Sequence, residues 1–426
     1  MSLFVIVTFM VLAFLGMPLA FALGVSALAG LWMSGIDLLV LPPRLMNSVN
    51  SFPLMSIPLF MIAGELMLKG GIMDRLVEFA NAFIGRMRGG LAQVAIVSGA
   101  GLASVSGAAV ADASALSSTL VPSLRKQYGL GFSTGVVAAA ANLGPIIPPS
   151  GAMIVYAFMA GSSVSVGGMF MSGVVPGLIL FACFMFLCWL IAWKRDYPLA
   201  GVPFSLGHVA REFRRSFIVF LMPVIVIGGI VAGAFTPTEG AAIGVCYALF
   251  LGFFVTRQLK VADLPGVLLT AAKTSAVVAA MIAYASTVTF LFTIDMLPFK
   301  LAALLQDLTQ NPLVFLGLVA VMLLVVGMFL ESNAAYIMLV PLFHPIAVSY
   351  GIDPLHFGFL FVLNLVIGML TPPVGVVLFV VTGITGVKMG ELVRESWPFI
   401  AAMYAVLLLC MLVPGVVTWL PERLGY

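Results

Sequence analysis

The sequence GPIIPPSG at residues 144–151 interrupts one long apolar segment of the chain, and GMLTPPVG at residues 368–375 interrupts another in a similar way. Each stretch contains a Pro-Pro pair. Proline has no backbone N–H and clashes with the preceding turn, so it leaves carbonyl oxygens without helical partners. Inside a membrane, such a break is tolerated only where the backbone lines a cavity or is covered by protein. The two stretches therefore predict two broken helices beside an internal site.

The composition places these breaks in a membrane protein. Hydrophobic residues make up 62% of the 426 residues, and charged residues only 8%. Soluble domains contain about 25% charged residues. A soluble enzyme is therefore excluded, and so is a nucleic-acid-binding protein, because phosphates need concentrated patches of Lys and Arg. Since a membrane-spanning helix takes about 20 residues, the chain is predicted to be an all-α polytopic membrane protein with about ten transmembrane helices.

The distribution of basic residues predicts the orientation of these helices. The predicted spans are 3–17, 19–36, 52–68, 131–157, 168–193, 216–234, 239–256, 273–294, 355–380 and 397–420. Two further apolar stretches, 89–124 and 312–345, each need a central turn and are predicted to be re-entrant hairpins. With an external N-terminus, all basic residues except Arg44, Lys300 and Arg423 fall on the cytoplasmic side. This follows the positive-inside rule and predicts that both termini lie outside.

Two charged segments are expected outside the apolar core. Residues 72–88 are amphipathic and basic, which predicts a helix along the cytoplasmic interface. Residues 194–215 are the most charged stretch of the chain and divide it into two halves. The predicted organisation is therefore a first repeat over 1–193, a basic cytoplasmic linker over 194–215 and a second repeat over 216–426.

The two halves repeat one pattern in opposite orientation. Met17-Pro18 at the end of the first span corresponds to Thr236-Pro237, and Val121-Pro122 in the first hairpin corresponds to Val340-Pro341, with equal spacing in both pairs. The two Pro-Pro stretches follow in the same order. Each half has five spans and one hairpin, and an odd number of spans inverts the second half. This predicts the inverted-repeat architecture of secondary transporters, whose sites lie near the midplane.

Oxygen atoms gather at the predicted breaks. Freed carbonyls near Gly144 and Gly368, the hydroxyls of Ser106 and Thr371, and the amide of Asn333 are ligands that a hard cation such as Na⁺ prefers. The alternative is that the breaks are only helix kinks packed against their neighbours. Two such breaks, each following a hairpin, favour the ion site.

Four acids lie at or near membrane depth, where ionisable residues are costly and usually functional. Asp112 and Glu331 are predicted at the hairpin tips, and we expect them to belong to the site. Glu239 follows Thr236-Pro-Thr, where a carboxylate also satisfies the free N–H groups of a helix start. For Glu65, near a span end, we expect snorkelling toward the interface.

The remaining ionisable residues bear on the kind of chemistry. The spans contain no Lys or Arg except Lys273, which is predicted at a span start, so an anion would be held by helix N-termini, hydroxyls, amides and bound Na⁺. His208, His344 and His356 fall in loops or at span ends, so a proton relay is not favoured. Ser104 and Ser106 have no histidine base deep in a span, which argues against an intramembrane serine protease.

At these residues the sequence resembles a known family, the large membrane subunit (DctM) of the tripartite ATP-independent periplasmic, or TRAP, transporters. The stretches that carry the resemblance are FPLMSIPLF (52–60), AGEL (63–66), RGGL (88–91), SGAAVADA (106–113), GPIIPPS (144–150) and FTPTE (235–239). The family often has a second Ser where this chain has Ala108, so one hydroxyl that could contact a substrate is absent.

The resemblance implies an elevator mechanism, in which a scaffold holds a transport domain made of the hairpins and broken helices. It implies coupling to Na⁺, with at least two ions, in a bacterial inner membrane. The expected partners are a small four-helix membrane subunit, a periplasmic substrate-binding protein, membrane lipid and an organic anion such as a C4-dicarboxylate, sialic acid, sugar acid or keto acid; no nucleic acid is expected.

The resemblance also implies site residues by position. One Na⁺ site would use Ser106, Gly107, Gly144 and Pro148, and the other would use Ser332, Asn333, Gly368 and Thr371. Asp112, Asn142 and Ser150 are the predicted substrate-side residues. Three alternatives stay open from the residues: a stand-alone Na⁺/carboxylate symporter of the same architecture, a channel, and a receptor or structural membrane protein.

Overall fold

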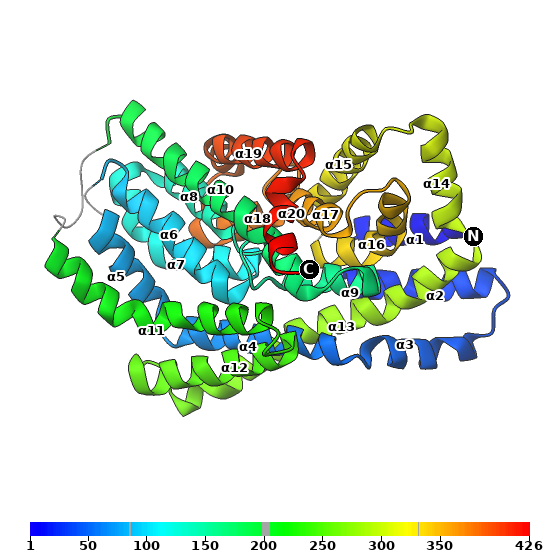
Figure 1. The fold of residues 1–426 in the computed structure, drawn as a ribbon, viewed down its shortest axis with the longest axis horizontal. Helices are drawn as coiled ribbons and strands as arrows, with labels where there is room; N and C mark the ends of the chain where they lie inside the picture. Colours follow the sequence, from blue (N-terminus) through cyan, green and yellow to red (C-terminus); the bar gives the residue numbers. More distant parts are fainter. Residues whose placement is uncertain (85–86, 198–204, 331) are drawn as a thin grey trace.

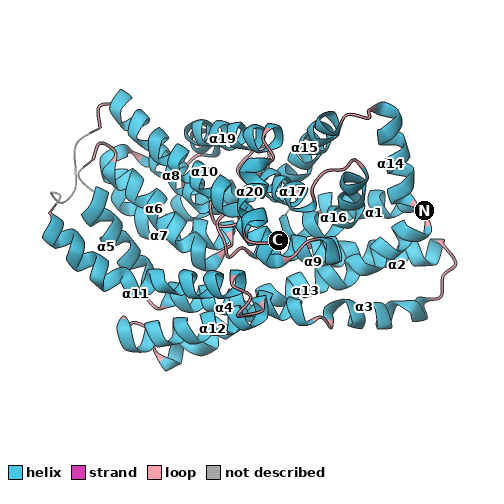
Figure 2. Cartoon of the chain, in the orientation of Figure 1, coloured by secondary structure: helices cyan, strands magenta, loops and turns pink. Residues whose placement is uncertain are grey.

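The computed structural model describes residues 1–84, 87–197, 205–330 and 332–426, and in these residues every regular element is helical (Figures 1 and 2). The first half forms α1 (Ser2–Phe14), α2 (Leu19–Met33), η1 (Leu38–Val40), α3 (Leu41–Val49), η2 (Phe52–Met55), α4 (Ser56–Lys69), α5 (Ile72–Ile84), α6 (Gly90–Ser106), α7 (Ala109–Tyr128), α8 (Leu130–Ala141), α9 (Gly151–Ala160), η3 (Gly161–Ser163) and α10 (Val166–Lys194). The second half forms α11 (Leu206–Val231), α12 (Pro237–Phe250), η4 (Leu251–Val255), η5 (Val261–Asp263), α13 (Leu264–Ile294), α14 (Leu297–Leu308), α15 (Pro312–Phe329), α16 (Ser332–Ser349), α17 (Pro354–Met369), α18 (Val376–Thr385), α19 (Met389–Leu412) and α20 (Gly415–Arg423).

The order of elements repeats between the halves. A hairpin, α6 with α7, precedes the broken helix α8 and α9, and a second hairpin, α15 with α16, precedes the broken helix α17 and α18. The halves interlock, because α7 packs against α18 and α16 packs against α9. The second arm of each hairpin therefore lies on the broken helix of the other half. The predicted class, an all-α polytopic membrane protein, is confirmed.

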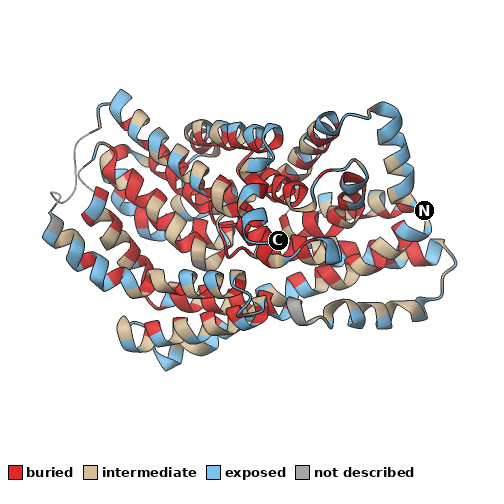
Figure 3. Cartoon of the chain, viewed as in Figure 1, coloured by how far each residue is buried: buried red, intermediate tan, exposed pale blue. Residues whose placement is uncertain are grey.

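The helices divide into two groups. Helices α2, α3, α4, α11, α12 and α13 lie along the lower edge of the molecule in Figure 1, and the long α13 packs against α2, α3 and α4. The hairpins and broken helices occupy the centre, where most residues are buried (Figure 3). We call the first group the scaffold helices and the second the central helices.

Seven helices of the described chain are long and apolar enough to cross a membrane, or eight if the bent pair α4 and α5 is one span. They are α10, α11, α12 with η4, α13 with its preceding turn, α15, α16 and α19. The remaining apolar helices, including α1, α2 and the four half-helices, are shorter. The two predicted spans 131–157 and 355–380 are thus each divided, at the Pro-Pro stretches that predicted the breaks.

Several predicted boundaries were wrong, for a common reason. Helix α11 begins within the predicted linker, whose residues 198–204 lie outside the described residues, and α13 begins well before the predicted start at Lys273. Lys273 is therefore inside a helix, with an exposed side chain. A helix continues through basic residues because their long stems lie along it while the charge stays in water. Hydropathy finds the apolar core of a span, and not the ends of its helix.

Other elements escaped the sequence analysis altogether. Helices α3 and α14 were not predicted, and the predicted last span 397–420 is the helix α19 followed by the separate α20. Helix α5 covers most of the amphipathic segment 72–88, of which 85–86 lie outside the described residues. Helices α3 and α14 are short and carry proline in their first turn, so neither gives a span-length apolar signal.

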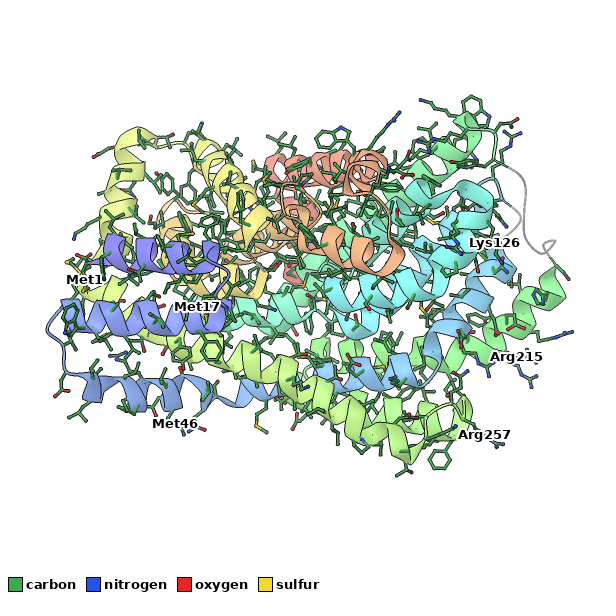
Figure 4. All side chains as sticks on the ribbon, turned by 180° about the vertical axis from the view of Figure 1, so that it is seen from behind. Met1, Met17, Met46, Lys126, Arg215 and Arg257 are labelled. Carbon is green, nitrogen blue, oxygen red and sulfur yellow. The ribbon has the colours of Figure 1, made fainter. Side chains whose placement is uncertain are left out.

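Three basic side chains from different parts of the sequence lie at one end of the long axis (Figure 4). Lys126, Arg215 and Arg257 lie at one end of the molecule, and Met1 lies at the other (Figure 4). The three basic residues belong to the set expected on the cytoplasmic side. Their common placement fits the orientation that the charge distribution predicts, which stays a prediction.

Candidate functional site

A cavity of about 450 Å³ lies where both hairpin tips and both broken helices meet. The tips supply Ser106, Gly107, Ser332 and Asn333, while α4 and α13 close the cavity from the scaffold side. Its lining residues are Ile57, Phe60, Met61, Ser106, Gly107, Ala108, Ala109, Val110, Ala111, Ser114, Pro145, Pro149, Gly151, Ala152, Val155, Thr274, Val278, Ser332, Asn333, Met369 and Val376. Segments from both repeats and from both helix groups thus line one cavity.

The first hairpin tip is a tight turn built on glycine. Gly107 has a φ of 60°, in the left-handed region that favours glycine. A Cβ on Gly107 would lie 2.7 Å from the carbonyl oxygen of Pro149. The turn therefore brings the tip directly against the broken helix. Within the turn, the backbone N–H of Ala108 donates to Oγ of Ser106 over 3.3 Å.

Asp112 lies one turn into α7, behind the tip. Its side chain is fully buried, and the Ser106 hydroxyl donates to Oδ1 of its carboxylate. The other oxygen, Oδ2, is buried without a hydrogen-bond partner in the structure. A Cβ on Gly144 would lie 2.5 Å from this Oδ2, so the carboxylate reaches the break after α8.

A buried carboxylate with an unpartnered oxygen is costly unless a cation or proton offsets it. The oxygen atoms of Ser106 and Asp112 lie beside the backbone at Gly144, and hard cations take oxygen ligands of these kinds. The residues present at the first tip therefore fit Na⁺. Gly144 is needed because any side chain would occupy the space of the carboxylate oxygen.

The predicted substrate-side residues Asn142 and Ser150, and Pro148 of the predicted first ion site, lie around the cavity and not on its wall. Ser150 is fully buried; its hydroxyl donates to the carbonyl of Pro145 over 2.7 Å and caps α9 by accepting from Met153 N. Asn142 donates from Nδ2 to the carbonyl of Val366 over 3.1 Å, which ties α8 to α17. Pro148 is buried, and its bond to the next proline is cis. Their direct roles in binding stay predictions.

The second tip offers neutral oxygens. Ser332 begins α16 and lines the cavity, and its Oγ is buried without a partner in the structure. Asn333 follows it on the cavity wall. Glu331, the acid predicted at this tip, lies outside the described residues.

The other two residues predicted at the second site lie behind the wall. Gly368 packs against the hairpin backbone, since a Cβ there would lie 2.6 Å from the carbonyl carbon of Gly327. Thr371 is buried, and its hydroxyl donates to the carbonyl of Ile367 over 2.7 Å. The structure thus brings Ser332 and Asn333 to the cavity and gives Gly368 the role of a close-packing residue.

Four helix N-termini converge on the cavity. Helices α7, α9, α16 and α18 all have residues of their first turn on its wall. Each N-terminus carries a partial positive charge and free N–H groups. No side chain caps α7, whose residues Ala109, Val110 and Ala111 all line the cavity. Since no Lys, Arg or His is among the described lining residues, these helix ends are the positive elements that can attract an anion.

The scaffold wall and two inter-repeat contacts were not foreseen. Phe60 and Met61 of α4 and Thr274 and Val278 of α13 line the cavity, yet nothing in their local sequence marks them. His344 of α16 bonds through Nδ1 to the Tyr156 hydroxyl and through Nε2 to Ser163, each over 2.8 Å. The sequence offered only a histidine near a span end, and the bridge depends on how hairpin and broken helix meet.

The two remaining acids have distinct environments. Glu239 accepts the backbone N–H of Thr236 over 2.8 Å and donates its own N–H to the Thr236 hydroxyl, which forms the capping box of α12. This confirms the expected helix-start contact. Glu65 lies half-buried on α4. Neither residue lines the cavity.

Comparison with known proteins gives consistent results over nearly the whole chain. Residues 6–416 match the family model described as the tripartite ATP-independent periplasmic transporter, DctM component. A C4-dicarboxylate TRAP transporter large permease protein of Pseudomonas aeruginosa is 37% identical, over 95% of this chain and 94% of its own. A 2,3-diketo-L-gulonate large permease of Escherichia coli is 34% identical over 95% of both chains. A sialic acid large permease of Vibrio cholerae is 36% identical over 97% of both.

The fold also has a solved counterpart. The crystal structure of the YdaH transporter of Alcanivorax borkumensis, described as having an unusual topology, matches with a TM-score of 0.64. The match covers 88% of each chain at 14% identity. At that identity the likeness concerns the fold alone.

Proposed function

The chain belongs to the DctM component family of the tripartite ATP-independent periplasmic transporters, and on this premise we propose that it couples the import of an organic acid anion to Na⁺. It is a large permease subunit, and its relatives with printed functions are transporter permeases and not enzymes. The printed substrates of the relatives are a C4-dicarboxylate, a diketo sugar acid and sialic acid. All are organic acids, which sets the substrate class of the proposal.

The proposal rests on one observation, which is that N-terminal and C-terminal ends of helices meet around the same cavity. The N-termini of α7, α9, α16 and α18 face the cavity, and the C-terminal ends of α6, α8, α15 and α17 lie at the same tips and breaks. Half-helix N-termini favour an anion, and C-terminal ends with freed carbonyls favour a cation. One site is thereby suited to both an anionic substrate and its coupling ions.

Two cation positions follow from the two tips. At the first, Ser106, Asp112 and the backbone beside Gly107 and Gly144 would hold one Na⁺. At the second, Ser332 and Asn333 would supply oxygens, with the break after α17 behind them. A cation beside Asp112 would also neutralise this buried carboxylate, which would otherwise repel a substrate carboxylate. Cation binding would therefore favour anion binding in the same cavity.

The arrangement of the two helix groups supports an elevator movement. The cavity lies between the central helices, which carry the tips and breaks, and α4 and α13 of the scaffold. Sliding of the central helices along the scaffold would carry the hairpin tips and helix breaks with them, past the wall that α4 and α13 provide. Family membership further supports a small four-helix subunit and a periplasmic binding protein as partners, and a bacterial inner membrane as the location. The distribution of basic residues supports periplasmic termini.

The test is uptake of labelled organic acids into proteoliposomes that contain this chain with its small subunit. Four conditions are compared, with and without a binding protein and with and without an inward Na⁺ gradient. Uptake that needs both is the expected result. Uptake that needs Na⁺ but not the binding protein would support the stand-alone symporter instead. Flux that is not saturable and ignores the gradient would contradict coupled transport.

A further inference from the structure

We propose that the cavity selects a monocarboxylate with an apolar body, in preference to a dicarboxylate or a polyhydroxylated sugar acid. This inference rests on the proposed function, because it assumes that the cavity is the anion site. It concerns the permease itself, and not the binding protein that delivers the substrate.

One carboxylate can be satisfied at the wall. Helix α7 has twenty residues and no side-chain cap, and three residues of its first turn line the cavity. Its free N–H groups can donate to an anion. An independent feature points to a ligand in the same space: Ser332 lines the cavity, its side chain is 6% exposed, and its Oγ is buried without a partner in the structure. The hydroxyl of Ser332 can donate to the same carboxylate or to a group beside it.

The rest of the wall is predominantly apolar. Its large side chains are Ile57, Phe60, Met61, Val110, Val155, Val278, Met369 and Val376. Besides Ser332, the described lining residues offer polar side chains only at Ser106, Ser114, Thr274 and Asn333, and Ser106 already donates to Asp112. The position before α7, which could have supplied a further hydroxyl, is Ala108. An apolar substrate body would therefore meet hydrocarbon over most of its surface.

Polar groups of a substrate would bind less favourably in this cavity than apolar groups. A buried hydroxyl or carboxylate that loses water without gaining a partner opposes binding. A sugar acid brings one hydroxyl on nearly every carbon, and the described wall has few polar side chains to meet them. A dicarboxylate brings a second full charge, and the described wall, which has no Lys, Arg or His, can meet it only with the partial charge of another helix N-terminus. The shortage of polar and basic side chains on the wall therefore disfavours both sugar acids and dicarboxylates.

The experiment measures direct binding, so that delivery by a binding protein cannot impose its own selectivity. The large permease with its small subunit is placed in lipid nanodiscs, and binding is followed by calorimetry with and without Na⁺. The probes are 3-methylbutanoate, glutarate and xylonate, which have the same number of carbon atoms. We expect Na⁺-dependent binding of 3-methylbutanoate that is at least about tenfold tighter than that of the other two, the scale of one unpaired polar group.

A variant tests whether the wall causes the preference. Val110→Ser adds a hydroxyl to the cavity. It should reduce the ratio of the affinity for 3-methylbutanoate to the affinity for xylonate by about threefold to tenfold. The matched control is Ala115→Ser, on the same helix but outside the cavity, which should leave the preference unchanged. If both variants behave alike, the wall does not set the selectivity.

The outcomes separate the inference from the proposed function. Na⁺-dependent binding of glutarate or xylonate as tight as that of 3-methylbutanoate would overturn the inference and leave the proposed function standing. If none of the three acids binds in a Na⁺-dependent way, the inference is overturned, and the uptake experiment above decides the proposed function separately.

Discussion

The two hairpins have the same helical plan but different chemistry at their tips. Hairpin one presents a buried carboxylate, Asp112, bonded to the hydroxyl of Ser106. At the spacing that relates Val121-Pro122 to Val340-Pro341, the residue that corresponds to Asp112 is Glu331, which lies outside the described residues. The described residues of hairpin two offer Ser332 and Asn333 instead. Among the described residues, the first tip therefore offers a carboxylate and a hydroxyl, and the second offers a hydroxyl and an amide.

The breaks behind the hairpins differ in a second way. Asn142, at the end of α8, donates across the molecule to Val366 in the other repeat, whereas Asn364 donates to Ala320 within its own repeat over 2.8 Å. In both, Oδ1 is buried without a partner in the structure. The two amides thus donate to different kinds of partner, and of the two only Asn142 connects the two repeats. We expect the first site to be the more sensitive to substitution.

The largest effect should come from Asp112→Asn. The amide keeps the shape of the side chain but removes its negative charge from the first tip. We expect the apparent Na⁺ affinity for uptake to fall by about a hundredfold, the scale of a charged contact worth about 3 kcal/mol. Uptake at increasing Na⁺ concentrations measures this. The control is Asp353→Asn, which also loses a charge but retains the oxygen that caps α17; an equal loss in both variants would contradict a special role for Asp112.

Gly368→Ala should cause the next largest effect, on stability. The added Cβ would lie 2.6 Å from backbone of Gly327, which is not a flexible side-chain end and cannot turn aside. Overpacking of this kind destabilises by about 1–3 kcal/mol. Thermal unfolding of the purified complex measures it. Gly317→Ala, in the first arm of the same hairpin, meets nothing within 4 Å and should be neutral or slightly stabilising; a matching drop there would show a general intolerance and not close packing.

Ser332→Ala should separate ion binding from stability. The hydroxyl is buried without a partner in the structure, so its removal should leave the melting temperature unchanged or slightly higher. The apparent Na⁺ affinity should nevertheless fall by about fivefold, corresponding to about 1 kcal/mol. Ser117→Ala removes a similarly buried and unpartnered hydroxyl on α7 away from the cavity. A loss of Na⁺ affinity in that control would argue against a ligand role for Ser332.

The smallest effect concerns Asp295, an exposed acid that contrasts with Asp112. The Lys300 ammonium, 2.9 Å away, and the backbone N–H of Ser2 hold the pKa of the Asp295 carboxyl well below its usual range. Because the pKa of the Asp295 carboxyl is lower in the folded protein than in the unfolded chain, the ionised carboxyl stabilises the fold. This stabilisation is present above the unfolded pKa of about 3.9 and is lost as the pH falls through the folded pKa.

We therefore expect a slight acid-induced loosening of α1 from α13, measurable by amide hydrogen exchange below about pH 4. Asp295→Asn should remove this pH dependence. If exchange in α1 is equally acid-sensitive in that variant, another group is responsible.

Much of the fold followed from the sequence because its causes are local. Paired prolines flanked by glycine interrupt a helix, so the stretches at 144–151 and 368–375 marked both breaks, whereas a single proline such as Pro176 stays inside a helix. The Thr236–Glu239 capping box was visible because it depends on residues three apart. Helix ends in basic segments, as at Lys273, were missed because hydropathy reports the membrane core and not helix continuity.

The sequence by itself determined that this chain is a polytopic membrane protein with two similar halves, because apolar composition and helix breakers act within one segment. Only the tertiary structure decided which segments meet. The contact of Asp112 with Gly144 and the bond of Asn142 to Val366 join residues far apart in the chain. So does the cavity wall of Thr274 and Val278. Such contacts depend on how whole helices pack, and packing is settled by the combined fit of many side chains rather than by any local pattern.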